Sequence, residues 1–153
     1  MALQDIAAAV QTFLKDVDGI HKVSDRPGGA ATWATDKRRG RNYWEIDIRA
    51  ASEEPAGIGR CAFRYYTVRI DGYMPLSYEN PNSAAVWRPL VDTVCDELRS
   101  NMSLGQSVND AGLPQIVTND RIIFSAGGNA PEVVCHHVGL ELRVRRFFTF
   151  TTA

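Results

Sequence analysis

A long run of alternating residues toward the end of the sequence limits the fold more than any other feature. From Glu132 to about Phe150 the residues on one face are Val134, His136, Val138, Leu140, Leu142 and Val144. Glu141, Arg143 and Arg145 fall on the opposite face. This period of two is typical of a half-buried β-strand. Because the run far exceeds the usual strand of five or six residues, we expect it to bend or to extend past the body of the domain.

Two further strands are predicted to pair as a hairpin. Residues 44–49 alternate apolar and charged side chains, and residues 60–71 are rich in aromatic and β-branched residues. Residues 51–59 hold several helix and strand breakers and predict the turn or loop between them. The expected core face of the second strand carries Tyr66, Val68 and Ile70. Phe63 and Tyr65 alternate in the opposite phase, which either a bulge near Arg64 or burial of both faces would explain.

Two amphipathic helices are also predicted. Residues 3–17 place apolar side chains at the spacing of one helical face, and Gly19 follows as a stop signal. A second helix is expected to begin between Ser83 and Arg88 and to end near Asn101. Proline lacks a backbone N–H, so Pro89 is expected in the first turn of this helix. The apolar face of the second helix comprises Trp87, Leu90, Val91, Val94, Leu98 and Met102.

The remaining segments show weaker patterns. Residues 18–42 have no period, and loops longer than about 12–15 residues are unusual in compact domains. We therefore expect a long loop there, which packs against a partner or is mobile until it does. Residues 115–117 and 121–125 predict short strands with a turn at 119–120. The element order predicts an α+β fold in which two helices flank a mostly antiparallel sheet, and 153 residues suit a single domain spanning 1–153.

Charge and composition exclude several classes of protein. The 17 Lys and Arg residues nearly balance 18 Asp and Glu residues, so DNA or acidic lipid could be bound only by a local patch. No apolar run approaches the roughly 18 residues that cross a bilayer, and the first residues do not have the pattern of a signal peptide. Three widely spaced cysteines, at 61, 95 and 135, suit reduced thiols better than a disulfide framework.

Motifs for catalysis or metal binding are not found. The sequence has no phosphate-binding loop, no Gly-x-Ser-x-Gly and no His-Glu-x-x-His. In a strand Cys135 and His137 would share one face and His136 the other, and two ligands fall short of the four that a closed tetrahedral site needs. Burial of this segment in the sheet is the favoured interpretation. We therefore predict no catalytic residue, no metal and no cofactor, and no enzymatic activity.

Four basic residues, Lys37, Arg38, Arg39 and Arg41, gather within five positions of the predicted long loop. They could bind phosphates, with nearby tryptophan and tyrosine side chains stacking on bases. A solvated or partner-facing loop is favoured, because the rest of the chain adds no basic excess. Arg143, Arg145 and Arg146 suit ion pairs across a subunit boundary as well as simple exposure. Glu53 and Glu54 are interpreted as a solvated charge pair.

The order of elements resembles that of the tail terminator, or tail-completion, proteins of long-tailed bacteriophages and related prophages. Three stretches carry the resemblance: LQDIAAAVQTFLKDV (3–17), WRPLVDTVCDELRSNMSLG (87–105) and VVCHHVGLELRVR (133–145). Together with the element order, the resemblance covers nearly the whole chain.

The resemblance implies a structural virion protein of the neck, with no membrane association. Such proteins form a ring, typically a hexamer, at the head-proximal end of the tail tube. The ring stops tube polymerisation and provides the attachment surface for the head connector, while genomic DNA passes through its lumen without specific binding. The implied partners are further copies of the chain, the major tail tube protein and the head-completion or connector protein. The expected location is the virion tail, after assembly in the host cytoplasm.

Two other functions stay open. One is a head-closure or other neck protein of related fold, and the other is a small nucleic-acid-binding module that uses the basic cluster at 37–41. In a ring, each subunit needs two different faces that close by rotation, and an edge strand could add to the neighbouring sheet. The predicted long loop, the 51–59 turn and the long last strand are the segments expected to reach neighbours. The basic cluster is expected to face outward or toward the tube protein, because in a lumen it would attract DNA.

Overall fold

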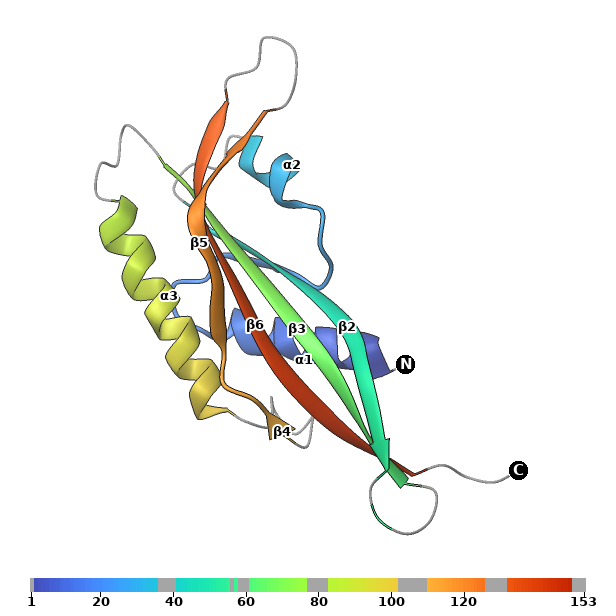
Figure 1. Ribbon diagram of the computed structural model, residues 1–153. Coiled ribbons are helices and arrows are strands. Elements are labelled where there is room, and N and C mark those ends of the chain that lie inside the picture. The colour runs from blue at the N-terminus through green and yellow to red at the C-terminus, as the bar shows by residue number, and fades with distance from the viewer. Residues whose placement is uncertain are drawn as a thin grey trace.

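In a computed structural model of the chain, the described residues form three helices that pack on the two faces of a six-stranded sheet (Figure 1). The structure describes residues 2–35, 41–55, 57, 61–76, 83–101, 110–125 and 132–149. The helices are α1 (Ala2–Lys15), α2 (Ala30–Thr35) and α3 (Ser83–Ser100). The strands are β1 (Lys22–Ser24), β2 (Tyr43–Pro55), β3 (Cys61–Pro75), β4 (Asp110–Ala111), β5 (Gln115–Phe124) and β6 (Val133–Thr149). The predicted α+β class is confirmed, with one helix more than expected.

Strand β6 lies in the middle of the sheet, although it comes last in sequence among the described elements. The strand order is β1-β2-β3-β6-β4, and β5 pairs with β6 on the same side as β4. Among the strand pairs that the structure describes, β1 and β2 run parallel and the others are antiparallel. Figure 1 shows that β2, β3 and β6 continue past the ends of α1 and α3. The long run in the sequence is therefore one strand that extends beyond the helices.

Helices α1 and α3 cover one face of the sheet, which we call the helix face. Gly19, at a left-handed φ of 93°, follows α1. Most described apolar positions of the two predicted stripes are buried, namely Ile6, Ala7, Val10, Leu14, Val17, Trp87, Leu90, Val91, Val94 and Leu98. Phe13 is half-buried, and Met102 lies outside the described residues. Most strand residues that the alternation placed inward meet the helices there: Tyr66, Val68, Ile70, His136, Val138, Leu140, Leu142 and Val144 are buried. Val134, predicted for the same face, is only half-buried. Gly72 leaves room for the ring of Trp44, which is fully buried and stacks on Trp87 with ring centroids 5.5 Å apart. These contacts form the main core.

The opposite face, which we call the open face, is covered by α2 at one end. Trp33 of α2 stacks on Tyr43 at 5.4 Å between ring centroids, and Tyr73 and Cys135 join this second apolar cluster. The prediction of a long loop over 18–42 is thus wrong for its described part, which holds β1 and α2 and packs on the sheet. Elements of three and six residues contain too few repeats to give a periodic signal.

Three local predictions are corrected. Residues 51–55 belong to β2 rather than to a turn, and the irregularity of the hairpin lies on β2, between Ala50 and Ser52, rather than near Arg64. Residues 119 and 120 are not a turn, because β5 is continuous and only shifts register between Ile116 and Thr118. The shift breaks the alternation that would have marked one strand.

Pro89 lies at the seventh position of α3 rather than in its first turn. Its ring is on the exposed side of the helix. Because proline has no N–H, the carbonyl four residues earlier loses its helical hydrogen bond, and water can take that place on the exposed side. Among the residues that the structure describes, no helix is long and apolar enough to span a bilayer.

Candidate functional site

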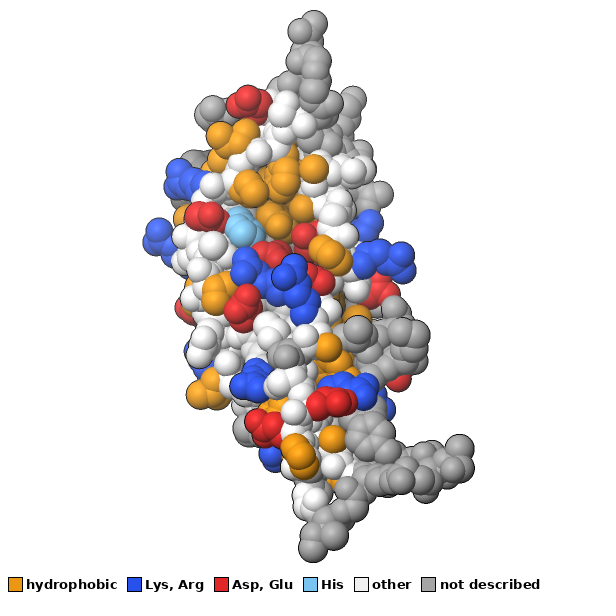
Figure 2. Space-filling view, turned by 45° about the vertical axis from the view of Figure 1, so that its right-hand side comes forward, with side chains coloured by type: hydrophobic (Ala, Val, Ile, Leu, Met, Phe, Trp, Pro, Cys, Tyr) orange, Lys and Arg blue, Asp and Glu red, His pale blue; other side chains and the backbone are white. Residues whose placement is uncertain are grey.

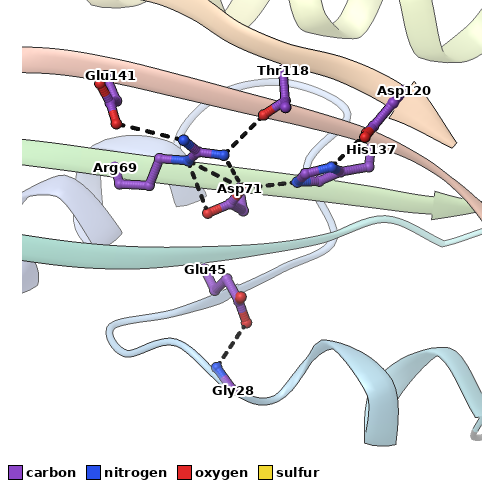
Figure 3. Close-up of polar contacts among 8 residues, drawn as sticks. All are labelled: Gly28, Glu45, Arg69, Asp71, Thr118, Asp120, His137 and Glu141. Atoms are coloured by element: carbon purple, nitrogen blue, oxygen red, sulfur yellow. Dashed lines mark hydrogen bonds and ion pairs between the residues drawn. The ribbon is translucent and has the colours of Figure 1, made fainter. Parts of the chain in front are cut away.

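A cluster of charged side chains lies on the open face, at the junction of three strands (Figure 3). Strand β3 supplies Arg69 and Asp71, and β6 supplies His137 and Glu141. Strand β5 supplies Asp120, with Thr118 beside it. Within each strand the two positions are two or four residues apart, so their side chains point to the same face.

The guanidinium of Arg69 is the centre of the cluster. It donates to both carboxylate oxygens of Asp71, with Nε–O distances of 3.3 and 3.2 Å, and to the Thr118 hydroxyl at 2.8 Å. Its third contact is Glu141, at 3.5 Å. Gly139 makes this position possible, because a Cβ there would collide with the Arg69 guanidinium and the Thr118 hydroxyl. Arg69 therefore links β3, β5 and β6.

The imidazole of His137 lies between two carboxylates. Its Nε2 is 2.8 Å from Asp71 Oδ1 and its Nδ1 is 2.7 Å from Asp120 Oδ1. Tyr73 stacks on the ring, with centroids 4.7 Å apart. Burial by itself would lower the pKa of His137, but the hydrogen bonds to Asp71 and Asp120 outweigh it and raise this pKa above its ordinary value. The protonated ring, which donates from both nitrogens, fits this site best.

The carboxylates of the open face differ in their proton affinity. Burial would raise the pKa of Asp71, but the hydrogen bonds from His137 and Arg69 lower it overall. Glu45 lies beneath the loop before α2, where it is 7% exposed and accepts a 3.2 Å hydrogen bond from the backbone N–H of Gly28. Burial raises the pKa of Glu45, and the negative charge of Asp71 adds to that shift. Asp71 therefore stays ionised to a lower pH than an ordinary aspartate, and its negative charge lies between the Arg69 and His137 side chains.

This arrangement is better suited to holding strands β3, β5 and β6 together than to catalysis. A general base needs a free lone pair near the substrate, whereas both ring nitrogens of His137 are already bound to carboxylates. Among the described residues, no group of three or more His, Cys, Asp or Glu side chains is placed to hold a metal ion. The cluster joins three strands through charge-assisted hydrogen bonds, which are stronger than neutral ones.

The two neighbouring histidines are expected to titrate in opposite directions. His136 lies on the helix face, where burial lowers its pKa and the positive charges of Arg121 and Arg88 lower it further. An NMR titration of the ring protons should place the pKa of His137 above the ordinary value of about 6.5 and that of His136 below it. The two carboxylates stabilise the fold while the His137 ring is protonated. Their contribution to the free energy of unfolding is therefore complete below about pH 6.5, the ordinary pKa of histidine, and it is lost as the pH rises through the raised pKa of the folded state.

The Asp120→Asn variant is the control for this titration. It removes one carboxylate from His137 and should lower the pKa of that ring while leaving the pKa of His136 nearly unchanged. A His137 ring that titrates below pH 6.5 in the unaltered protein would contradict the charged bridge between Asp71 and Asp120.

The structure gives the residues singled out from the sequence different surroundings. Lys37, Arg38 and Arg39 lie outside the described residues, and Arg41 is exposed. Arg143, Arg145, Arg146, Glu53 and Glu54 lie toward the end of the sheet where β2 ends and β3 begins, on residues 52–55 of β2, 61–65 of β3 and 143–149 of β6. At this end the strands extend past the helices (Figure 1). We call these residues of the three strands the projecting ribbon.

The projecting ribbon has different contacts on its two faces. On the open face Arg143 lies 4.2 Å from the centre of the Tyr65 ring, and the Tyr65 hydroxyl donates to Glu54 at 3.0 Å. On the same face Arg145 lies 4.5 Å from the centre of the Phe63 ring. On the other face two ion pairs form, between Arg64 and Glu53 at 2.6 Å and between Arg146 and Asp5 at 3.8 Å. The interpretation of Glu53 and Glu54 as a solvated pair is thus only partly right, because both are exposed but each has a partner.

The segment Cys135-His136-His137 lies in β6 with its side chains on alternate faces, as the strand pattern predicted. All three residues are buried. Burial raises the pKa of the Cys135 thiol to about 12, so the reactive thiolate is scarce at neutral pH. The sequence did not indicate Arg69, Asp71 or Asp120, although opposite charges at alternate positions of neighbouring strands could have suggested the cluster.

Two long strand edges are unpaired in the described part of the chain. Strand β5 pairs only with β6, and β2 pairs with β1 only at residues 43–45, so that its edge is free from Ile46 to Pro55. These edges lie on opposite sides of the sheet (Figure 1). Four exposed apolar side chains lie on β5 or just before it: Leu113, Ile116, Val117 and Ile123, each between 43% and 66% exposed.

Acidic and basic side chains lie next to one another on the face drawn in Figure 2, rather than in separate patches of one sign. This surface would not attract a polyanion strongly. No protein-family model matches the chain. A search of curated proteins finds no significant match either.

Proposed function

We propose that this chain is a structural virion protein that forms a ring, with six subunits as the expected number, at the head-proximal end of a phage tail tube. The observation that carries the proposal is the pair of unpaired edges, β5 and β2, on opposite sides of one sheet. Unpaired edges are templates for pairing with another chain, and natural proteins usually shorten, charge or cover them. Here β5 is ten residues long and apolar side chains are exposed along it.

Such edges favour a closed ring over a two-fold dimer. A ring needs two different surfaces on each subunit, so that each copy presents one surface to the copy before it and the other to the copy after it. Strand β5 of one subunit would pair with β2 of the next, and main-chain hydrogen bonds would supply affinity. The exposed side chains of Ile116 and Ile123 would then leave water.

The projecting ribbon supports the same assembly. It lies at the end of the sheet where the strands extend past α1 and α3 (Figure 1), and it carries Glu54, Arg143 and Arg145 on one face. In a ring this ribbon would lie over the adjacent subunit, where its arginines meet acidic side chains. The ring would stop tube polymerisation by covering the last layer of tube protein, and its other rim would receive the head connector.

The first test is the size of the purified protein. Native mass spectrometry should show a ring-sized oligomer, alone or after addition of tail tube protein, and electron microscopy should show rings at one end of the tubes. A strict monomer that neither binds nor caps tubes would refute the proposal. Rings that bind the connector of filled heads but never tube ends would instead identify a head-closure or neck protein of related fold.

The nucleic-acid alternative has its own measurement. DNA binding, measured over a range of salt concentrations, should be absent even at low salt, or should not change when Lys37, Arg38, Arg39 and Arg41 are replaced by serine. A clear loss of binding in that variant would favour the nucleic-acid-binding module.

A further inference from the structure

A surface pocket of about 280 Å³ lies between α3 and β5, on the helix face of the sheet, and shares one residue, Asp120, with the charged cluster of the open face. Ala84 and Arg88, one turn apart on α3, form one wall, and Trp87 lies between them. Asn119 and Arg121 of β5 form the other wall, and His136 of β6 lines the pocket as well.

The base of the pocket is held rigidly. The Nε2 atom of His136 is 3.0 Å from the Ser83 hydroxyl, and the ring is stacked with Trp87 at an interplanar angle of 17°. His136, Trp87 and Ser83 are all at most 7% exposed. Because packing fixes these side chains, the pocket exists before any ligand arrives, which lowers the entropic cost of binding.

The groups around the pocket give it a positive charge. Arg121 is the cross-strand neighbour of His136, and Arg88 faces it from the helix. Both guanidiniums are exposed, and neither forms an ion pair within the described part of the chain. Both act on the same ring, because their positive charges add to burial in lowering the pKa of His136. The side-chain amide of Asn119 adds a neutral donor.

The one acidic residue of the lining does not cancel this charge. The carboxylate of Asp120 is directed to the opposite face of the sheet, where its Oδ1 lies 2.7 Å from His137 Nδ1. Asp120 therefore contributes to the wall of the pocket without offering its negative charge there. Two unpaired guanidiniums beside a neutral, buried imidazole form an environment that a polar cation would avoid.

We propose that this pocket binds a compact oxyanion, a phosphate or carboxylate group, between the guanidiniums of Arg88 and Arg121. Arginine presents a planar fork of N–H donors that matches two oxygens of such a group. A water molecule takes about 30 Å³ of liquid volume, so a pocket of 280 Å³ admits a small anion or one acidic side chain. The site acts in a single subunit and does not depend on the proposed ring.

Isothermal titration calorimetry at low ionic strength tests the site, with inorganic phosphate and succinate as separate probes. The unaltered protein should bind at least one of them with a saturable 1:1 curve, and the probe that binds more tightly identifies the preferred oxyanion. The Arg88→Ser/Arg121→Ser double variant should bind it at least about tenfold more weakly, since it removes both groups of charged N–H donors that would hold the oxyanion.

The matched control is the Arg49→Ser/Arg99→Ser double variant, which removes the same charge from two exposed positions outside the pocket. Its affinity should stay within about twofold of the unaltered protein if the effect is local rather than a general consequence of charge. An NMR spectrum should also show the Trp87 indole and His136 ring signals shifting with the same saturation curve. The absence of saturable binding by either probe, or an equal loss in both double variants, would overturn the proposal.

Discussion

Replacing Trp44 by alanine is expected to lower the free energy of unfolding by about 3–5 kcal/mol, as is usual when a large buried aromatic side chain is removed. Trp44 is fully buried, stacks on Trp87, and donates from its Nε1 to Asn42 at 3.0 Å. Urea denaturation followed by circular dichroism measures the change. The free energy of unfolding of a small domain is about 5–15 kcal/mol in total. A substantial fraction of the Trp44→Ala molecules would therefore be unfolded on mild heating.

Two alanine variants make this prediction specific. Gly72→Ala tests the packing around Trp44 by adding an atom instead of removing the ring. The new Cβ would lie 2.5–2.7 Å from three atoms of the Trp44 ring. It should cost about 1–3 kcal/mol, as overpacking of a core does. Val86→Ala, at an exposed position of α3, should change the stability by no more than about 0.5 kcal/mol. A loss at Trp44 no greater than that at Val86 would contradict the described core.

Lysine at two positions of the β5 edge is expected to abolish assembly without unfolding the subunit. Ile116 and Ile123 are 51% and 59% exposed, so the monomer tolerates charge there. In the proposed ring both would be buried, and burying an isoleucine side chain contributes about 1.5–3 kcal/mol. The Ile116→Lys/Ile123→Lys variant should therefore assemble at least about 100-fold more weakly, and lysine also blocks pairing of strand edges.

Sedimentation velocity over a range of concentrations measures this loss, and thermal unfolding shows whether the subunit stays intact. Val86→Lys is the matched control, since it replaces a similarly exposed apolar residue on α3, away from the strand edges. Rings that persist in the β5 variant would rule out that edge as the contact. Loss of rings in the Val86 variant as well would point to a general effect of charge.

The parts of the fold that have long, regular patterns could be predicted from the sequence. The stripe of α1, the helix face of β6 and the pairing of β2 with β3 each rest on many repeats of one period, and the structure confirms them. Elements held by a few specific contacts could not be predicted. Helix α2 has six residues and is placed by the packing of Trp33 on Tyr43, a contact that no local pattern expresses.

The charged cluster shows a different limit of sequence analysis. Asp71 and His137 are 66 residues apart in the chain and meet only because β3 and β6 pair in one register. Asp120 was assigned to a turn, since the register shift after Ile116 conceals that β5 is one strand. A sequence reveals that a charged residue faces away from the core, but its partner depends on the alignment of strands that are distant in the chain.

The position of β6 also has a consequence for the order in which the protein forms on the ribosome. Strands β3 and β5 both pair with β6, which consists of residues 133–149. A nascent chain that has emerged only as far as α3 contains the β2–β3 hairpin but lacks β6. The backbone N–H and C=O groups along one edge of β3 then have no strand partner. Sheets built from contacts distant in sequence also form slowly. The subunit therefore completes its sheet only after those residues leave the exit tunnel, and until then the hairpin is open to premature association.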